Sequence, residues 1–428
     1  MLSFLSNRAT AAHLAIAAVA PLVLCKYLPT GSVCHVLTWL TLVCVVWAVM
    51  APSRYGEENS VMARRRFLGH MASDPAFWVL AAVLVYSSVV ALNSGVSLAY
   101  DAELKIWSLK EPAATMLPGG VRGACGGYFA MSLLALALYP AVAHALDSRQ
   151  SVYFAITASF VVLTDAVYAY VSGAGIPSGS AAAYGLWALV SSAAMFSAER
   201  SRQRPKELVS ALSLSGCLAA LLFIGRPVTL IVFAAATFVL AVLFTAFRFR
   251  ELGVLGVIRS FLMLFVAAAI AAVVYHWRSG DWETLAAAWG SPVDSVFSRM
   301  AVAAWESAPW TGSGAGSFPL VVKIGATPED WASLGAIPDF TGNGWRTLLV
   351  ERGMIGVLVT AVAFGALLFT WFRNAVKRGL DGFAAAVPLL PLAIAALSVV
   401  MVFDGSALRV EAILAFVSLA AFSVNGGQ

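Results

Sequence analysis

Four arginines border the apolar stretches of this sequence at positions where they could bind a phosphate: Arg226, Arg299, Arg346 and Arg409. Arg226 is the most informative, because it occupies a very short turn between two apolar runs. A guanidinium so close to hydrocarbon is costly unless it is paired or hydrated. Guanidinium groups also bind phosphate oxygens in a bidentate manner. We therefore expect an anionic headgroup, such as a pyrophosphate, at these residues. The alternative is an arginine that only extends to interfacial water.

Carboxylates are the candidates for a general base, which assists the transfer of a group onto a hydroxyl. No histidine follows His276, so the base would be a carboxylate or His276 itself. The acidic candidates are Glu306, Asp339, Glu351 and Asp404. Asp165 lies in the middle of an apolar run, where we expect it either to relay protons or to hydrogen-bond a neighbouring helix.

A glycine-rich turn, Pro309–Phe318, lies among these charged residues. Its glycines permit positive φ angles and a close approach of the backbone to a ligand. The turn follows no predicted strand, so it is not a nucleotide-binding fingerprint. Tryptophans on either side are typical of a membrane interface, and their faces also stack on sugar rings. The predicted substrate contacts are Arg346, Arg409, Trp305, Asn343, Trp345, Gly312 and Gly314.

The composition indicates a polytopic membrane protein. Of the 428 residues, 61% are hydrophobic and only 11% are charged, whereas a soluble domain carries about 25% charged residues. The mean hydropathy is +0.85. The net charge of +5 is best explained by basic cytoplasmic loops and does not suggest nucleic acid as a partner. The cysteines and histidines form no metal-binding pattern and no Walker motif is present, so we predict neither a metal nor another cofactor.

A spanning helix needs about 20 mainly apolar residues, and about twelve stretches meet that requirement. The predicted spans are residues 10–28, 33–51, 76–94, 124–145, 152–171, 181–198, 208–224, 228–246, 255–275, 347–372, 383–403 and 411–426. A polar loop with three arginines at 64–66 separates the second span from the third, and a polar segment at 95–122 follows the third. The predicted fold is an all-α polytopic integral membrane protein with one large external loop that contains short helices.

Basic residues predict the orientation of these spans. If the amino terminus is cytoplasmic, the short inner loops collect the arginines and lysines, as the positive-inside rule requires. Both termini are then cytoplasmic, and the loop at 277–346 lies outside. The predicted organisation is nine transmembrane helices in residues 1–276, a catalytic loop at 277–346 and three further helices in 347–428.

The pattern of the long loop resembles that of the O-antigen ligase and Wzy-type O-antigen polymerase superfamily. The family motif is an arginine, an aromatic residue, a proline, Gly-x-Gly and a further aromatic residue. The matching residues are Arg299, Trp305, Pro309, Gly312, Gly314 and Phe318. The end of the family loop resembles Asn343 and Trp345, followed by Glu351 and Gly353. Arg226 resembles an outer-face arginine of the family, and Asp404 resembles an acidic position between its last two helices.

One departure is clear: Gly342 stands where the family has a histidine that is proposed to activate the acceptor. The resemblance otherwise implies an inverting, metal-independent glycosyltransferase of the GT-C type in the bacterial inner membrane, with the loop in the periplasm. The implied donor is a glycan on undecaprenyl pyrophosphate, and the arginines would stabilise the departing pyrophosphate. Among the site residues, Arg226, Arg299, Glu306, Asp339 and Asp404 are then expected to be catalytic.

Three functions remain open. A polymerase would join lipid-linked repeat units, and we favour this because the altered loop end suggests an unusual acceptor. A ligase would move the finished glycan to lipid A-core or another acceptor. The implied partners of either are a flippase and a chain-length regulator. A transporter or flippase is the third candidate: Asp165 favours it, whereas the lack of Gly/Pro-broken helices in matching halves disfavours it.

Overall fold

The computed structural model describes residues 2–27, 30–50, 60–93, 97–103, 106–110, 125–146, 148–172, 176, 178–200, 204–279, 295–314, 316–325, 343–378 and 389–425. Nearly all of these residues are helical. The long helices are α1 (Leu2–Tyr27), α2 (Thr30–Met50), α4 (Pro75–Leu92), α5 (Cys125–Pro140), α6 (Ser148–Val171), α7 (Ala181–Arg200), α8 (Arg204–Ile224), α9 (Pro227–Ser279), α14 (Gly344–Arg378), α15 (Leu389–Phe403) and α16 (Val410–Asn425). The shorter elements are α3 (Ser60–Ala72), β1 (Ser97–Asp101), β2 (Ile106–Lys110), η2 (Ala141–Ala145), η3 (Ser178–Ser180), α11 (Ser295–Glu306), α12 (Phe318–Val321), η4 (Val322–Gly325) and η6 (Gly405–Leu408).

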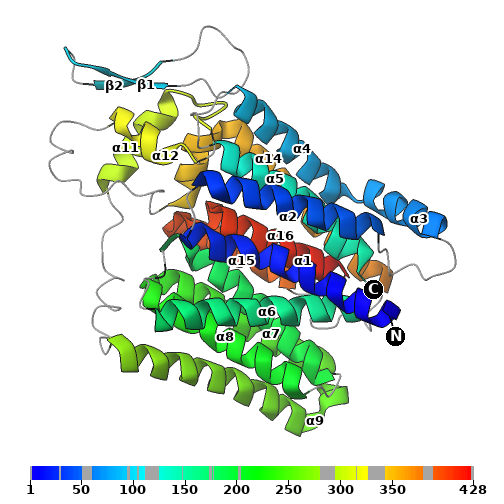
Figure 1. The fold of residues 1–428 in the computed structure, drawn as a ribbon. Coiled ribbons are helices and arrows are strands. Elements are labelled where there is room, and N and C mark those ends of the chain that lie inside the picture. The colour runs from blue at the N-terminus through cyan, green and yellow to red at the C-terminus, as the bar shows by residue number, and fades with distance from the viewer. Residues whose placement is uncertain are drawn as a thin grey trace.

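The long helices lie side by side in one bundle (Figure 1). Both chain termini lie at one end of the bundle, which we call the inner end. The strands β1 and β2 and the short helices α11 and α12 lie at the opposite end, which we call the outer end. The polar segments of the sequence are thereby separated from the apolar ones along the bundle axis.

Helix α9 folds back on itself. The rings of Phe238 and Phe261 have centroids 5.8 Å apart, whereas a straight helix would separate these residues by about 35 Å at about 1.5 Å per residue. The second half of α9 then returns along α8, where Arg259 forms an ion pair with the buried Glu207. The reversal lies at the inner end (Figure 1), so α9 corresponds to the two predicted spans at 228–246 and 255–275.

The core is centred on α7 and α16. Every residue of α7 from Ala181 to Phe196 is buried, and so is almost every residue of α16 from Glu411 to Val424. Both helices are rich in alanine and serine, and such small side chains allow neighbouring helix backbones to approach closely. A helix that is apolar on all sides is expected in the centre of a bundle.

Six helices are long and apolar enough to cross a membrane, counted over the described residues. They are residues 75–92, 127–145, 150–171, 204–224, 228–246 and 344–373. Further apolar helices, at residues 10–24, 35–47, 181–196, 261–276, 389–403 and 411–424, are shorter in the described part of the chain. The structure thus confirms the helical architecture.

Three local predictions need correction. Residues 60–72, predicted as a polar loop, form α3, which buries Ala63 and Phe67 and leaves the three arginines exposed. The polar segment after α4, for which no regular structure was predicted, contains a two-stranded antiparallel sheet in which Tyr100 pairs with Trp107. Helix α14 begins at Gly344 rather than at residue 347. These short elements lie in polar sequence, where the apolar-run criterion has no signal.

Candidate functional site

A break in α14 organises the outer end. Gly353 has φ 61° and ψ −168° inside this helix, a conformation that is essentially restricted to glycine. In a regular helix the carbonyls of Val350 and Glu351 would accept from the N–H groups of Met354 and Ile355. The break separates these four groups, and each of them needs another partner.

The glycine-rich turn supplies all four partners. Ser313 N–H donates to Val350 O at 3.0 Å, and Gly314 N–H donates to Glu351 O at 2.7 Å. In the other direction, Met354 N–H donates to Pro309 O at 3.0 Å, and Ile355 N–H donates to Trp310 O at 3.1 Å. The turn therefore replaces the hydrogen bonds that the helix has lost, and the N–H of Gly314 is used for this rather than for a ligand.

The contact is so close that it requires glycine on both sides. A Cβ added at Gly353 would lie 2.3 Å from Trp310 O, and one added at Gly312 would lie 2.4 Å from Arg352 N. Both distances are shorter than the contact distances that Cβ atoms show in proteins. Gly312 and Gly314 were predicted to contact substrate, but their observed contacts join the turn to α14. The sequence does not reveal this role, because the break at Gly353 cannot be read from composition.

Trp305, Trp345 and Asn343 were also predicted to contact substrate, and each forms a hydrogen bond within the protein. Trp305 Nε1 donates to Pro309 O at 3.2 Å, and its ring packs on the small apolar cluster around Phe318. Trp345 Nε1 donates to Ser398 O at 3.4 Å. Asn343 caps α14, because its Oδ1 accepts from Arg346 N–H at 3.1 Å. Trp345 thereby joins the start of α14 to α15, and Trp305 joins the end of α11 to the glycine-rich turn.

A second group of residues surrounds Asp404, which is buried with 2% exposure. Its Oδ1 accepts from Ser406 N–H at 2.9 Å, and its Oδ2 accepts from Thr229 Oγ1 at 2.9 Å. Ser406 Oγ in turn accepts from Ala182 N–H at 3.2 Å. Asp404 thus connects η6 to the start of α9, and Ser406 connects it to the start of α7.

Arg409 follows η6 and lies beside the amino end of α7. A Cβ built on Gly179 would be 2.8 Å from Arg409 Nε, so the guanidinium packs directly on this glycine. Glu411 Oε2 lies 3.8 Å from Arg409 Nε. A helix amino end carries partial positive charge, so a cation beside it is unfavourable, whereas an anion is favourable.

Tyr128 connects this group to the break in α14. Its hydroxyl donates to Leu408 O at 3.1 Å, and the guanidinium carbon of Arg352 lies 5.8 Å from its ring centroid. The charges of Glu351 and Glu411 also act on this hydroxyl. Glu351 is buried, and its Oε1 accepts from Phe318 N–H at 3.2 Å. The sequence prediction missed Tyr128, Arg352, Glu411 and Thr229, since only the fold brings them to this end.

Arg226 occupies the turn between α8 and α9 and is half-buried. It precedes Thr229 by one helical turn, so it lies at the same end of α9 as the contact with Asp404. Among the described residues, no carboxylate forms an ion pair with Arg226. Arg226, Asp404 and Arg409 thus lie at the same end of the bundle.

The remaining predicted residues stand apart from this group. Arg299 and Glu306 are exposed on α11, and Arg346 is exposed on the first turn of α14. Asp339 and Gly342, where the family histidine would stand, lie outside the described residues. Within the described part of the chain, no group of three or more histidine, cysteine, aspartate or glutamate side chains could hold a metal ion.

A separate buried cluster lies at the inner end around Asp74, which precedes α4. Its Oδ1 accepts from Ala76 N–H at 2.9 Å and from Thr370 Oγ1 at 3.2 Å. Its Oδ2 accepts from the Tyr139 hydroxyl at 3.0 Å and lies 2.8 Å from His144 Nε2. Burial alone would raise the pKa of Asp74, but the hydrogen bond and charge of His144 and the other donors hold it below its usual value.

Comparison with known proteins gives no relative from which a role could be transferred. No protein-family model matches the chain, and no curated protein matches it either. The function therefore has to be argued from the residues and their contacts.

Proposed function

We propose that the chain is a twelve-span inner-membrane protein with both termini in the cytoplasm and its outer end in the periplasm. The fold supports this, because the reversal of α9 gives two antiparallel segments and the other long helices run alongside them. Large apolar side chains also face outward from the bundle, among them Val85 at 63% exposure, Phe265 at 72% and Leu358 at 65%. An apolar outer surface of this extent fits contact with lipid.

We further propose that the protein transfers a glycan from undecaprenyl pyrophosphate to a hydroxyl at its outer end, as a polysaccharide polymerase. The observation that carries this proposal is Arg226, a half-buried guanidinium with no ion-pair partner among the described residues. A cation in such a position needs an anion or water. Arg409 at the amino end of α7 is a second position where an anion is favoured.

The proposed reaction uses these cations to stabilise a leaving group. The acceptor hydroxyl oxygen attacks the anomeric carbon, the bond from that carbon to the pyrophosphate oxygen breaks, and the electron pair leaves with the pyrophosphate. Arg226 and Arg409 would stabilise the charge that develops there. The hydroxyl proton passes to water, because the exposed Glu306 stands apart from these two cations on α11. Asp404 is already held by two donors and is better suited to position η6 and Arg409.

The ligase reaction is chemically the same transfer with a different acceptor, and the described residues do not favour it over polymerisation. The transporter alternative rests on Asp165. Asp165 accepts from the Tyr184 hydroxyl at 2.6 Å, which is the hydrogen bond between neighbouring helices that we considered as the alternative to a proton relay.

The test is a reconstituted transfer assay. The purified full chain in liposomes receives an undecaprenyl-pyrophosphate-linked repeat unit, with no ATP and with a metal chelator. We expect glycan chains longer than one unit on the lipid. Transfer only to an added lipid A-core acceptor would identify a ligase, and the absence of any new glycosidic product would contradict both transferase functions.

A further inference from the structure

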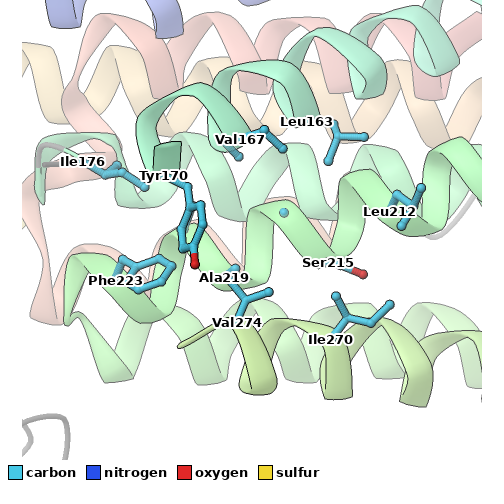
Figure 2. A pocket seen from close by; sticks show the side chains of 13 residues that line it. Leu163, Val167, Tyr170, Ile176, Leu212, Ser215, Ala219, Phe223, Ile270 and Val274 are labelled. Carbon is cyan, nitrogen blue, oxygen red and sulfur yellow. The ribbon is translucent and has the colours of Figure 1, made fainter. Parts of the chain in front are cut away.

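A cleft of about 210 Å³ lies on the side of the bundle between α6, α8 and the second half of α9. Figure 2 shows its walls: Leu163 and Val167 of α6 on one side, Ile270 and Val274 of α9 on the other, and α8 between them. None of the residues discussed so far as part of the site lies in this cleft. It is therefore a separate feature that needs its own explanation.

The lining of the cleft is almost entirely apolar. The hydroxyl of Ser215, which lies at its wall, donates to Ala211 O of its own helix at 3.0 Å. The rim is open on all three helices, with Val167 at 51% exposure, Leu212 at 38% and Ile270 at 38%. A ligand in this cleft would contact apolar side chains and would enter from the side of the bundle. A lipid chain would enter in the same way.

The outer end of the cleft is aromatic. The rings of Tyr170 and Phe223 have centroids 5.9 Å apart, and those of Phe223 and Tyr275 lie 5.6 Å apart. Tyr170 and Phe223 mark one end of the cleft in Figure 2. Arg226 follows Phe223 by three positions, in the turn that ends α8. A chain that lies along the cleft would therefore present its headgroup to a guanidinium.

The length of the cleft fits one leaflet of a membrane. From Leu212 to Phe223, α8 extends about 16 Å at about 1.5 Å per residue, which is about half of the roughly 30 Å hydrocarbon thickness of a bilayer. The volume is below the roughly 300–1,000 Å³ that encloses a whole small ligand. The cleft is thus suited to a segment of a long chain whose remainder stays in the bilayer.

We propose that this cleft binds the polyisoprenoid chain of a lipid phosphate, with the phosphate at Arg226. The proposal rests on the transferase function proposed above and adds the place where the donor lipid is held. The half-buried Arg226, three positions beyond the aromatic end of the cleft, favours a lipid that carries a phosphate over an uncharged lipid. The competing occupant is an acyl chain of the bulk phospholipid.

The test compares two neighbouring residues of α9. Val274→Trp fills the cleft, whereas Val273→Trp places the same side chain on the lipid-facing surface, where Val273 is 66% exposed. The full chain in phosphatidylcholine nanodiscs is incubated with photoreactive undecaprenyl phosphate, and labelled peptides are mapped by mass spectrometry. We expect labels on α6, α8 and α9 in the wild type and in Val273→Trp, and about tenfold weaker labelling in Val274→Trp, because overpacking excludes the chain. Thermal unfolding of both variants checks that each is folded.

The outcomes separate this proposal from the proposed function. Equal labelling of the two variants, or labels confined to other helices, overturns the cleft proposal even where glycan transfer is observed. Loss of labelling on addition of excess phosphatidylglycerol identifies a bulk phospholipid site and also overturns it. If the labelling follows our expectation but no transfer occurs in the reconstituted assay, the lipid site stands and the transferase function fails.

Discussion

Two buried aspartates at opposite ends of the helix bundle, Asp74 and Asp404, are bound in nearly the same way. Asp74 at the inner end and Asp404 at the outer end each precede a helical segment and accept from the backbone N–H two residues later. Each also accepts from a threonine of a distant helix, Thr370 for Asp74 and Thr229 for Asp404. Both carboxylates therefore fasten separate helices together.

The groups around the two carboxylates differ. At the inner end the Tyr139 hydroxyl and His144 also contact Asp74, so the charge is satisfied within the buried cluster. At the outer end Asp404 holds η6, while Arg226 is half-buried and the Arg409 side chain is 29% exposed. A closed cluster stabilises the fold, whereas Arg226 forms no ion pair with a carboxylate of the described residues and needs an anion or water. We infer that similar anchors serve stability at one end and binding at the other.

The largest effect should come from Asp74→Asn. Removal of one partner from a buried charged cluster leaves the others unsatisfied, and we expect a loss of about 3 kcal/mol of stability. Thermal unfolding of the protein in detergent measures this loss, and transfer per folded molecule should stay unchanged. Asp101→Asn, at an exposed carboxylate of β1, is the control and should have no effect. An unfolding temperature equal to that of the wild type would contradict the assigned role.

The same carboxylate predicts a pH dependence. Because the folded state lowers the pKa of Asp74, the ionised form stabilises the fold. This contribution is complete above the ordinary aspartate pKa of about 3.9 and is lost as the pH falls through the lower folded value. Unfolding temperatures measured from pH 6 downward should therefore decline more steeply below about pH 4 in the wild type than in Asp74→Asn. Parallel curves would show that Asp74 does not contribute.

Next in size is Gly353→Ala, which tests whether the outer end depends on the break in α14. The added Cβ would collide with Trp310 O in a backbone conformation reserved for glycine, and we expect a cost of about 3 kcal/mol. Protease sensitivity of the segment from Ser295 to Gly325 should rise. Gly365→Ala is the matched control, because a Cβ there meets nothing within 4 Å. It should stabilise the helix by up to about 1 kcal/mol. Equal stability and equal protease sensitivity of the two variants would contradict the steric argument.

Arg226→Ala should reduce glycan transfer by about 100-fold, as loss of one group that stabilises a leaving anion does. Arg226→Lys keeps the charge but loses the bidentate geometry of the guanidinium. Its transfer rate should therefore lie between those of the wild type and Arg226→Ala. The control is Arg204→Ala, at an exposed arginine that begins α8 at the inner end, and this variant should transfer normally. Near-normal transfer by Arg226→Ala in the reconstituted assay would contradict the proposal that Arg226 stabilises the departing pyrophosphate.

The sequence predicted the helices well because length and hydropathy are local properties. The position of Arg226 between two apolar runs predicted a turn between two helices, and the structure has that turn between α8 and α9. The motif at Gly312 and Gly314 was recognised, but its contact is with α14, and that contact depends on a backbone conformation at Gly353 far along the chain. Neither periodicity nor composition encodes such a pairing.

The cluster residues that the sequence prediction missed share one property. Thr229, Tyr128 and His144 are ordinary residues of apolar helices, and only packing brings them to a charged partner. Asp404 was selected from the sequence as a candidate general base. Its contacts, which only the structure reveals, indicate an anchor for η6. A buried charge is therefore easier to find from the sequence than its role.

The smallest predicted effect provides the most direct test of the comparison, because Thr229→Val and Thr370→Val remove the same hydrogen bond at opposite ends. Each should cost about 1.5 kcal/mol, the usual contribution of a hydrogen bond to a charged group. Thr370→Val should lower the unfolding temperature and leave transfer per folded molecule unchanged. Thr229→Val should also slow transfer, by up to about tenfold, because η6 and Arg409 lose a fixed position. If both variants slow transfer equally, the outer carboxylate has no special connection to binding, and the two ends differ only in exposure.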